Sequence, residues 1–254
     1  MQRFYEQIYA EPSGLPLRYD FFRPDSDIPI PLVVCIHGGG WISGEKEGMH
    51  EVAEMLASHG YAAACPQYRL APLHPFPSPV EDILACVTHL RASSEKLGLD
   101  PNRFASLGNS AGGHLAAMAG LSKFADSKVQ AVVEICGISD VTDPHGQHFP
   151  ISLGFLEQFM AQPFEGNEEL YRMASPLHQV QSGAPPFLIV HGEADDIVPF
   201  GQSVALAKKL EEVGTETELH ILPGEGHAFS FESWMEIEKL VLNFLQRTLR
   251  GVYV

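Results

Sequence analysis

Short apolar runs alternate with helix-forming segments along most of the chain. Several runs are apolar at nearly every position, which is typical of strands buried on both faces of a sheet. The expected strands are residues 17–22 (antiparallel), 32–36, 61–66, 104–108, 129–136, 187–192 and 217–222. The expected helices are residues 46–59, 79–97, 111–121, 201–212 and 232–249. This alternation predicts an α/β protein: a mostly parallel sheet with helices on both faces, built as one domain, 1–254.

One segment breaks the alternation. No strand is expected between Gly137 and Pro185, and the segment 138–184 is rich in aromatic residues. It could be a lid inserted over a substrate site, or a packed helical crossover whose aromatic side chains belong to the core. The pattern leaves both interpretations open.

Composition and charge narrow the class of protein. The chain has 45% apolar residues, enough for a full core, and a net charge of −16. Such an acidic balance argues against nucleic acid or an anionic membrane surface as a partner. The N-terminus lacks the apolar segment of a signal peptide, and no apolar stretch reaches membrane-spanning length. We therefore expect a cytoplasmic protein.

The cysteines agree with a reducing compartment. The four cysteines are Cys35, Cys65, Cys86 and Cys136. Each falls in or beside a predicted buried element, and no two of them form a C-x-x-C pair. We interpret them as small buried apolar side chains instead of disulfide or metal ligands.

Residues 108–112, Gly-Asn-Ser-Ala-Gly, are the most informative motif. They match G-x-S-x-G and lie between an expected strand and an expected helix, the setting in which this motif exposes a serine on a sharp turn. Glycine on both sides permits the close approach of backbone that such a turn needs. Ser110 is therefore the expected nucleophile.

A second motif, His37-Gly38-Gly39-Gly40-Trp41, follows the buried strand at 32–36. Glycines in this place leave backbone N–H groups free to bind a negatively charged oxygen that develops during a reaction. We expect the amides of Gly39, Gly40 and Ala111 to form an oxyanion hole. A phosphate-binding loop is disfavoured, because Trp41-Ile42 stands where a Lys-Ser/Thr pair would be needed.

The acid and base candidates come later in the chain, each just after an expected strand. His227 follows the last strand on a glycine-rich loop and is the expected base, with His114 as a weaker alternative. Asp195 is favoured over Asp196 and Glu193 as the carboxylate that orients the base, because of its spacing from the preceding Gly192. The order Ser, Asp, His is that of an α/β-hydrolase.

These motifs together resemble the α/β-hydrolase superfamily, within it the esterases of the hormone-sensitive-lipase-like and acetylxylan/feruloyl-esterase-like groups. The matching stretches are residues 37–41, 68–72, 76–82, 108–114, 191–199 and 224–227. The resemblance implies the α/β-hydrolase fold, with a twisted sheet of about eight strands. It also implies a serine carboxylesterase. The short region before His37 and the acidic balance of the chain favour short-chain esters, which could be those of acetylated or feruloylated carbohydrate. Two departures leave the substrate open: Asn109 replaces the usual aspartate of the lipase-like group, and the acid segment reads HGEADDIVP.

Several further expectations follow. Trp41, Phe149 and Phe155 are expected to contact the substrate. No cofactor is expected, and no metal, although His145 and His148 form an H-x-x-H pair. The apolar C-terminal residues 251–254 would suit a homodimer contact. An amidase or arylformamidase on the same residues is the main alternative, and a non-catalytic binding module is disfavoured because every member of the triad is present.

Overall fold

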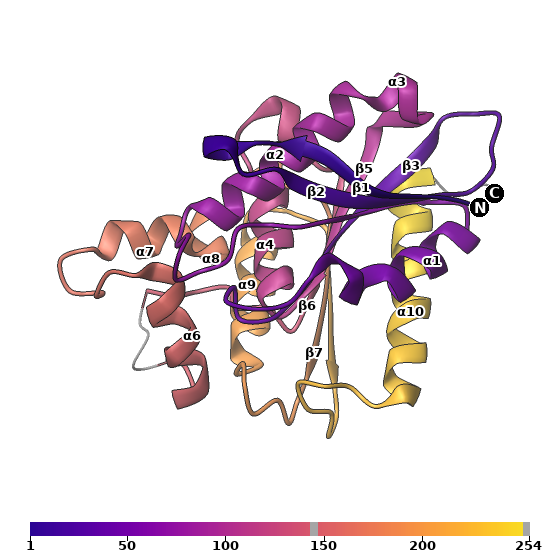
Figure 1. The fold of residues 1–254 in the computed structure, drawn as a ribbon. Coiled ribbons are helices and arrows are strands. Elements are labelled where there is room, and N and C mark those ends of the chain that lie inside the picture. The colour runs from indigo at the N-terminus through magenta and orange to yellow at the C-terminus, as the bar shows by residue number, and fades with distance from the viewer. Residues whose placement is uncertain (143–146, 251–254) are drawn as a thin grey trace.

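The computed structural model describes residues 1–142 and 147–250. In this part of the chain eight strands form one sheet in the order β1-β2-β4-β3-β5-β6-β7-β8. Their bounds are β1 Gln2–Ala10, β2 Leu17–Arg23, β3 Ile30–Ile36, β4 Ala62–Pro66, β5 Leu99–Asn109, β6 Ala131–Ile135, β7 Phe187–Gly192 and β8 Thr217–Leu222. The helices are α1 His50–Ser58, α2 Ser78–Ala92, α3 Ser94–Leu97, α4 Ala111–Gly120, α6 Pro150–Met160, α7 Glu168–Ala174, α8 Pro176–Gln179, α9 Gly201–Glu212 and α10 Phe231–Leu245 (Figure 1).

The strands from β3 to β8 all run parallel, whereas β1 and β2 pair antiparallel at one edge. The predicted mostly parallel sheet is therefore confirmed. A parallel sheet brings the carboxyl end of each strand to one edge, so the loops that follow β3, β5, β7 and β8 lie along that edge.

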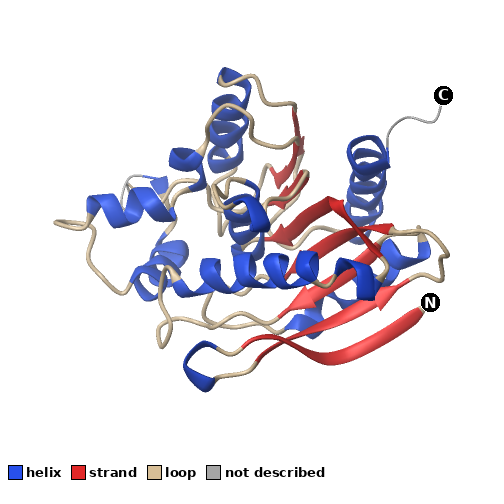
Figure 2. Cartoon of the chain, turned by 90° about the horizontal axis from the view of Figure 1, so that it is seen from above, coloured by secondary structure: helices blue, strands red, loops and turns tan. Residues whose placement is uncertain are grey.

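Helices cover both faces of the sheet, which explains the continuous apolar runs. Leu32, Val34 and Ile36 of β3 pack in one core cluster with α2, α4 and α9. Val33 and Cys35 point the other way, into a second cluster with α1 and α10. Figure 2 shows the helices on the two sides of the strands. Alternate residues of one strand thus bury opposite faces, as its pleat requires.

Strand β1 is the element that the sequence analysis missed. It is exposed at most positions and lies at the edge of the sheet, so it carries no buried apolar run.

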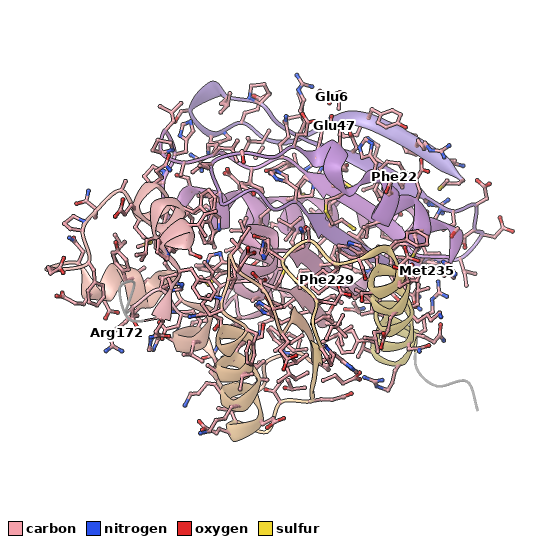
Figure 3. The ribbon with its side chains drawn as sticks, turned by 90° about the horizontal axis from the view of Figure 1, so that it is seen from below. Glu6, Phe22, Glu47, Arg172, Phe229 and Met235 are labelled. Atoms are coloured by element: carbon pink, nitrogen blue, oxygen red, sulfur yellow. The ribbon has the colours of Figure 1, made fainter. Side chains whose placement is uncertain are left out.

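A buried lysine ties this edge to the loop after β3: Lys46 Nζ lies 2.6 Å from Glu6 Oε1 and 3.0 Å from Asp20 Oδ2, and it also pairs with Glu47. Glu6 and Glu47 lie close together in Figure 3.

The expected helices form with shifted ends. The helix expected at 46–59 begins at His50 after a 3₁₀ turn at Lys46–Met49, and the one at 79–97 is divided into α2 and α3. The C-terminal helix α10 ends at Leu245, where a π-helical turn, Gln246–Arg250, follows. Its first turn is capped by Ser230, whose Oγ accepts from the Ser233 amide.

The segment between β6 and β7 forms α6, α7 and α8, which lie to one side of the sheet (Figure 1). It is anchored to the main body by a side chain that is fully buried, Phe159, and by a bond from the Phe76 amide to the Phe159 carbonyl. His145 and the C-terminal residues 251–254 lie outside the described residues. None of the described helices combines the length and the hydrophobicity needed to cross a membrane.

Candidate active site

Ser110 stands on a sharp turn between β5 and α4, as the motif predicts. Its backbone has φ 55° and ψ −123°, and its amide donates to the Ile135 carbonyl at 2.8 Å. Glycine is required on both sides: a Cβ on Gly108 would lie 2.3 Å from the Gly112 carbonyl oxygen, and one on Gly112 would lie 2.1 Å from that of Ile36. The turn brings Ser110 to the carboxyl edge of the sheet, half-buried.

The glycine-rich loop after β3 lies beside this turn, because Ile36 pairs with Gly108 in the sheet. A Cβ on Gly38 would lie 3.4 Å from Ser110 Cβ. Gly39 and Gly40 both have positive φ, 112° and 59°, which favours glycine at each position. The loop therefore approaches the serine closely through backbone atoms alone.

The amide groups predicted for the oxyanion hole make no hydrogen bond inside the described part of the protein. Among the described residues, no acceptor is found for the N–H groups of Gly39, Gly40 or Ala111. Ala111 is the first residue of α4, where backbone N–H groups have no partner within the helix. The Gly39 carbonyl accepts from the Ser43 amide at 3.0 Å, which fixes the turn of the loop. The Tyr68 hydroxyl donates a hydrogen bond to the His37 carbonyl at 3.0 Å, which holds the first residue of the loop.

The loops after β7 and β8 bring Asp195 and His227 together. His227 Nδ1 lies 2.7 Å from Asp195 Oδ2, with the aspartate fully buried and the histidine side chain 17% exposed. A carboxylate in this place orients the imidazole and stabilises its cation. Asp196 is exposed and lies outside this contact, and Glu193 is also exposed. Asp195, which the sequence analysis favoured because of its spacing from Gly192, is thus the aspartate that contacts His227.

Asp195 is held by four hydrogen-bond donors. Oδ2 accepts from His227 and from His191 Nε2 at 3.1 Å, and Oδ1 accepts from the amides of Ile197 and Val198, both at 2.8 Å. Burial alone would raise the pKa of Asp195, but the hydrogen bonds from the two histidines and the two amides outweigh it and lower that pKa. The group therefore stays ionised, as the orienting role requires.

His114, the alternative base, is engaged elsewhere. It is fully buried, its Nδ1 accepts from Trp41 Nε1 at 3.2 Å, and its Nε2 donates to the Ala174 carbonyl at 2.8 Å. Burial lowers the pKa of His114 to about 4, although the bond to Ala174 opposes the shift. With both ring nitrogens occupied, His114 links α4 to the end of α7.

The depressed pKa of His114 predicts a pH dependence of stability. Between the ordinary histidine pKa of ~6.5 and the folded value of about 4, the unfolded chain binds a proton at His114 that the folded chain does not bind. The free energy of unfolding therefore falls as pH falls through this range. We expect the loss to reach about 2 kcal/mol near pH 4.5. Urea unfolding of the wild type and of His114→Gln, each compared with its own value at neutral pH, measures it. An equal pH dependence in both proteins would contradict the assignment.

The three aromatic residues predicted to contact substrate occupy different places. Trp41 is 1% exposed and stacks on Phe159 with ring centroids 4.3 Å apart, so its side chain packs inside the protein. Phe155 of α6 is half-buried against the oxyanion loop, since a Cβ on Gly40 would lie 2.6 Å from its ring. Phe149 is 38% exposed at the start of α6. Of the three, Phe155 lies next to the predicted donors.

Two groups of described residues have metal-ligating atoms within 4.8 Å of one another: Cys136, Asp195 and His227, and Glu6, Asp20 and Glu47. The second group already surrounds the ammonium of Lys46. In the first group the aspartate and the histidine are bound to each other. The carboxylates of the second group are thus engaged by Lys46, and Asp195 of the first group is engaged by His227.

Comparison with known proteins shows the family and the fold of this chain. The chain matches the BD-FAE family over residues 19–210. It belongs to the BD-FAE family. The fold is shared with solved esterases: the native structure of esterase Est2 from Thermogutta terrifontis superposes with a TM-score of 0.81 at 23% identity, covering 95% of this chain and 91% of that one. An acetyl ester-xyloside bifunctional hydrolase from Caldicellulosiruptor lactoaceticus superposes with a TM-score of 0.82 at 24% identity, covering 93% and 89%. The predicted α/β-hydrolase fold is confirmed.

Curated relatives of this BD-FAE chain carry esterase names. Esterase LipC of Mycobacterium tuberculosis is 34% identical over 216 residues, which cover 79% of this chain and 53% of LipC. Ethyl acetate hydrolase of Pseudomonas putida is 30% identical over 232 residues, covering 85% of this chain and 71% of the hydrolase. The chain spans about half the length of LipC and of the similarly matched LipM and LipQ.

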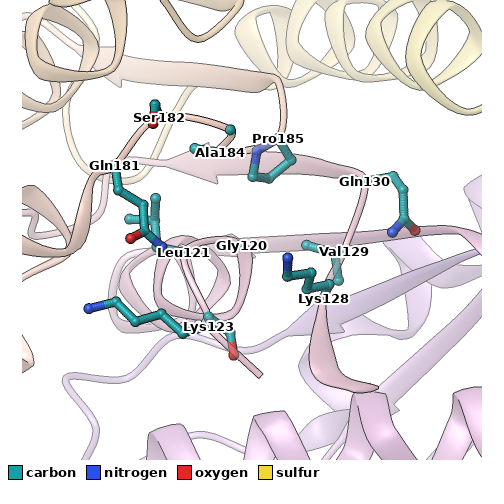
Figure 4. A pocket seen from close by; sticks show the side chains of 12 residues that line it. Gly120, Leu121, Lys123, Lys128, Val129, Gln130, Gln181, Ser182, Ala184 and Pro185 are labelled. Atoms are coloured by element: carbon teal, nitrogen blue, oxygen red, sulfur yellow. The ribbon is translucent and has the colours of Figure 1, made fainter. Parts of the chain in front are cut away.

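One cavity of the BD-FAE chain lies away from the candidate catalytic residues. Figure 4 shows a cavity of about 580 Å³ whose lining includes Gly120, Lys128 and Pro185. These residues lie at the end of α4 and just before β6 and β7, so the cavity is at the amino edge of the sheet. The candidate chemistry is at the opposite, carboxyl edge, which makes this cavity an unsuitable substrate site.

Proposed function

We propose that this chain is a serine carboxylic-ester hydrolase that works through an acyl-enzyme. The observation that carries the proposal is the 2.7 Å contact between His227 and a buried, ionised Asp195, at the same sheet edge as a serine on a strand–turn–helix corner. Serine is a poor nucleophile unless a base removes its proton, and an oriented histidine is that base.

In the proposed reaction His227 removes the hydroxyl proton of Ser110 as Ser110 Oγ attacks the ester carbonyl carbon. Asp195 stabilises the imidazolium that forms. The amides of Gly39, Gly40 and Ala111 are the proposed donors to the developing oxyanion, because backbone donors fixed in advance need no reorganisation. His227 then protonates the leaving alcohol, and a water molecule, activated by the same histidine, hydrolyses the acyl-serine and restores the hydroxyl.

A fluorophosphonate probe gives a direct test, because it reacts covalently with activated serines. Esterase 2 of Thermogutta terrifontis, which shares this fold, is phosphonylated by sarin. The probe should label the purified chain once, and mass spectrometry should place the label on the peptide that contains Ser110. Labelling at another serine, or none at all, would refute the proposal.

The proposed substrates are small esters with short acyl chains. Structures of the Thermogutta esterase contain propionate and butyrate, and one curated relative is an ethyl acetate hydrolase. In this chain Phe155 of α6 fills the space beside Gly40, and Trp41 and Phe159 fill the space behind the loop. We infer that these side chains limit the length of the acyl chain that can bind beside the loop.

This proposal predicts a peak in chain-length dependence. Each buried CH₂ adds up to ~0.8 kcal/mol to binding, so kcat/KM for p-nitrophenyl esters should rise from acetate to about C4–C6 and fall for longer chains. Phe155→Ala should move the peak to longer chains, whereas the control Phe124→Ala, at an exposed position, should leave it in place. A palmitate ester hydrolysed by the wild type as well as the butyrate ester would contradict it.

We also infer a cytoplasmic location. All four cysteines lie in the described part of the chain and are free and buried. Buried free thiols are common in proteins of reducing compartments.

A further inference from the structure

A chain of buried polar side chains continues inward from Asp195. His191 Nε2 lies 3.1 Å from Asp195 Oδ2, His191 Nδ1 lies 2.7 Å from Ser203 Oγ, and Ser203 Oγ lies 3.4 Å from Glu134 Oε2. These groups come from β7 and its following loop, from α9 and from β6. None of the four residues is more than 5% exposed. The triad mechanism uses only the outermost of them.

The contacts define where the proton of His191 sits. Its Nε2 faces two acceptors, the Asp195 carboxylate and the Val198 carbonyl, the latter at 3.0 Å. A carbonyl oxygen can only accept, so Nε2 carries the hydrogen and donates it. The unprotonated Nδ1 then accepts the single hydrogen of the Ser203 hydroxyl at 2.7 Å, which prevents the ring from turning over, and the 3.4 Å contact of Ser203 Oγ with Glu134 Oε2 is the weaker one.

Glu134 closes the inner end of the chain in a space that fits it. Its Oε1 accepts from the Gly137 amide, and Cβ atoms on Gly137 and Gly113 would lie 2.3 Å and 3.2 Å from that oxygen. Burial raises the pKa of Glu134, while His191, Gly137 and Ser203 oppose the shift. A buried carboxyl is costly unless it is hydrogen-bonded, and replacing both flanking glycines with larger residues would displace it. The two glycines therefore leave the space that the Glu134 carboxyl group occupies.

We propose that His191 is a positioning residue for Asp195, and that Ser203 and Glu134 hold His191 in the form that donates to the carboxylate. The inference rests on the proposed ester hydrolase function. Two backbone amides fix Oδ1 of Asp195, whereas within the described residues Oδ2 accepts only from His227 and His191. His227 changes its charge in every catalytic cycle, so His191 is the constant donor that keeps Oδ2 aimed at His227.

Two substitutions of similar size separate positioning from packing. The amide nitrogen of glutamine reaches about as far as histidine Nε2, so His191→Gln can still donate to Asp195. The shorter His191→Asn places its amide near the position of Nδ1, beside Ser203, and leaves Asp195 without this donor. We expect kcat to fall about 10- to 100-fold in His191→Asn, the range for a lost hydrogen bond to a charged group, with KM unchanged. His191→Gln should recover most of that loss.

Steady-state hydrolysis of p-nitrophenyl butyrate, with thermal unfolding of each variant, tests this. If both variants keep the wild-type kcat, or if both lose it equally in step with their stability, His191 only packs and the proposal is overturned. Ser203→Ala gives a second test should neither variant fold: a fall of about tenfold in kcat at unchanged KM supports the proposal, and an unchanged kcat overturns it. A wild type that hydrolyses no ester would instead overturn the proposed function itself.

Discussion

Replacing Ser110 with alanine is expected to reduce kcat for ester hydrolysis by about a millionfold, the effect typical of a lost triad nucleophile. The residual rate would come from the oxyanion donors and substrate binding, which the substitution leaves in place. The fold should be retained, because the serine hydroxyl makes no hydrogen bond within the described residues and alanine removes only that group.

The measurement is kcat/KM for p-nitrophenyl acetate together with the thermal unfolding midpoint. Ser58→Ala is the matched control, since Ser58 is exposed at the end of α1 and bonds only locally, to Met55 and His59. It should retain wild-type activity. A loss of less than about tenfold in Ser110→Ala, with an unchanged midpoint, would show that another residue is the nucleophile.

The second large effect is expected at Asp195. In Asp195→Asn the amide group faces His227 and His191, so one of its N–H groups opposes a donor or forces His227 into the wrong tautomer. A loss of about 10⁴ in kcat is typical of such a change. The neighbouring Asp196 is exposed, and Asp196→Asn should change kcat by no more than about twofold.

The two variants form a matched pair, because they make the same chemical change at adjacent positions. Circular dichroism at neutral pH checks that both are folded, since Asp195→Asn also disturbs four hydrogen bonds. If Asp196→Asn has the larger effect on kcat, the contact between Asp195 and His227 is not the one that supports catalysis.

Much of this site can be predicted from the sequence, because its parts are local. Ser110 depends on a strand, a turn and a helix that are contiguous, and the glycines around it are required by backbone contacts at that turn. Asp195 and His227 each follow a recognisable strand. Since parallel strands bring their carboxyl ends to one edge, their proximity follows from the order of elements alone.

What the sequence analysis missed depends on contacts between distant segments. Glu134 interrupts an apolar strand without indicating its partner, and its link to Ser203 spans 69 positions. The packing of the Trp41 ring against Phe159 and His114 was likewise not foreseen, and its contact with substrate stays a prediction. Strand β1 was missed because an exposed edge strand lacks the apolar pattern by which strands are recognised.

The backbone conformation of Ser110 lowers the stability of the folded protein. A non-glycine residue at φ 55° and ψ −123° costs of the order of 1–3 kcal/mol, an appreciable part of the 5–15 kcal/mol by which domains are typically stable. Glycine would adopt the same turn with little strain. A lineage selected for stability alone would drift towards glycine at position 110. The strained backbone thus coincides with the proposed nucleophile, and Ser110→Gly should raise the free energy of unfolding while removing the hydroxyl group that the proposed reaction needs.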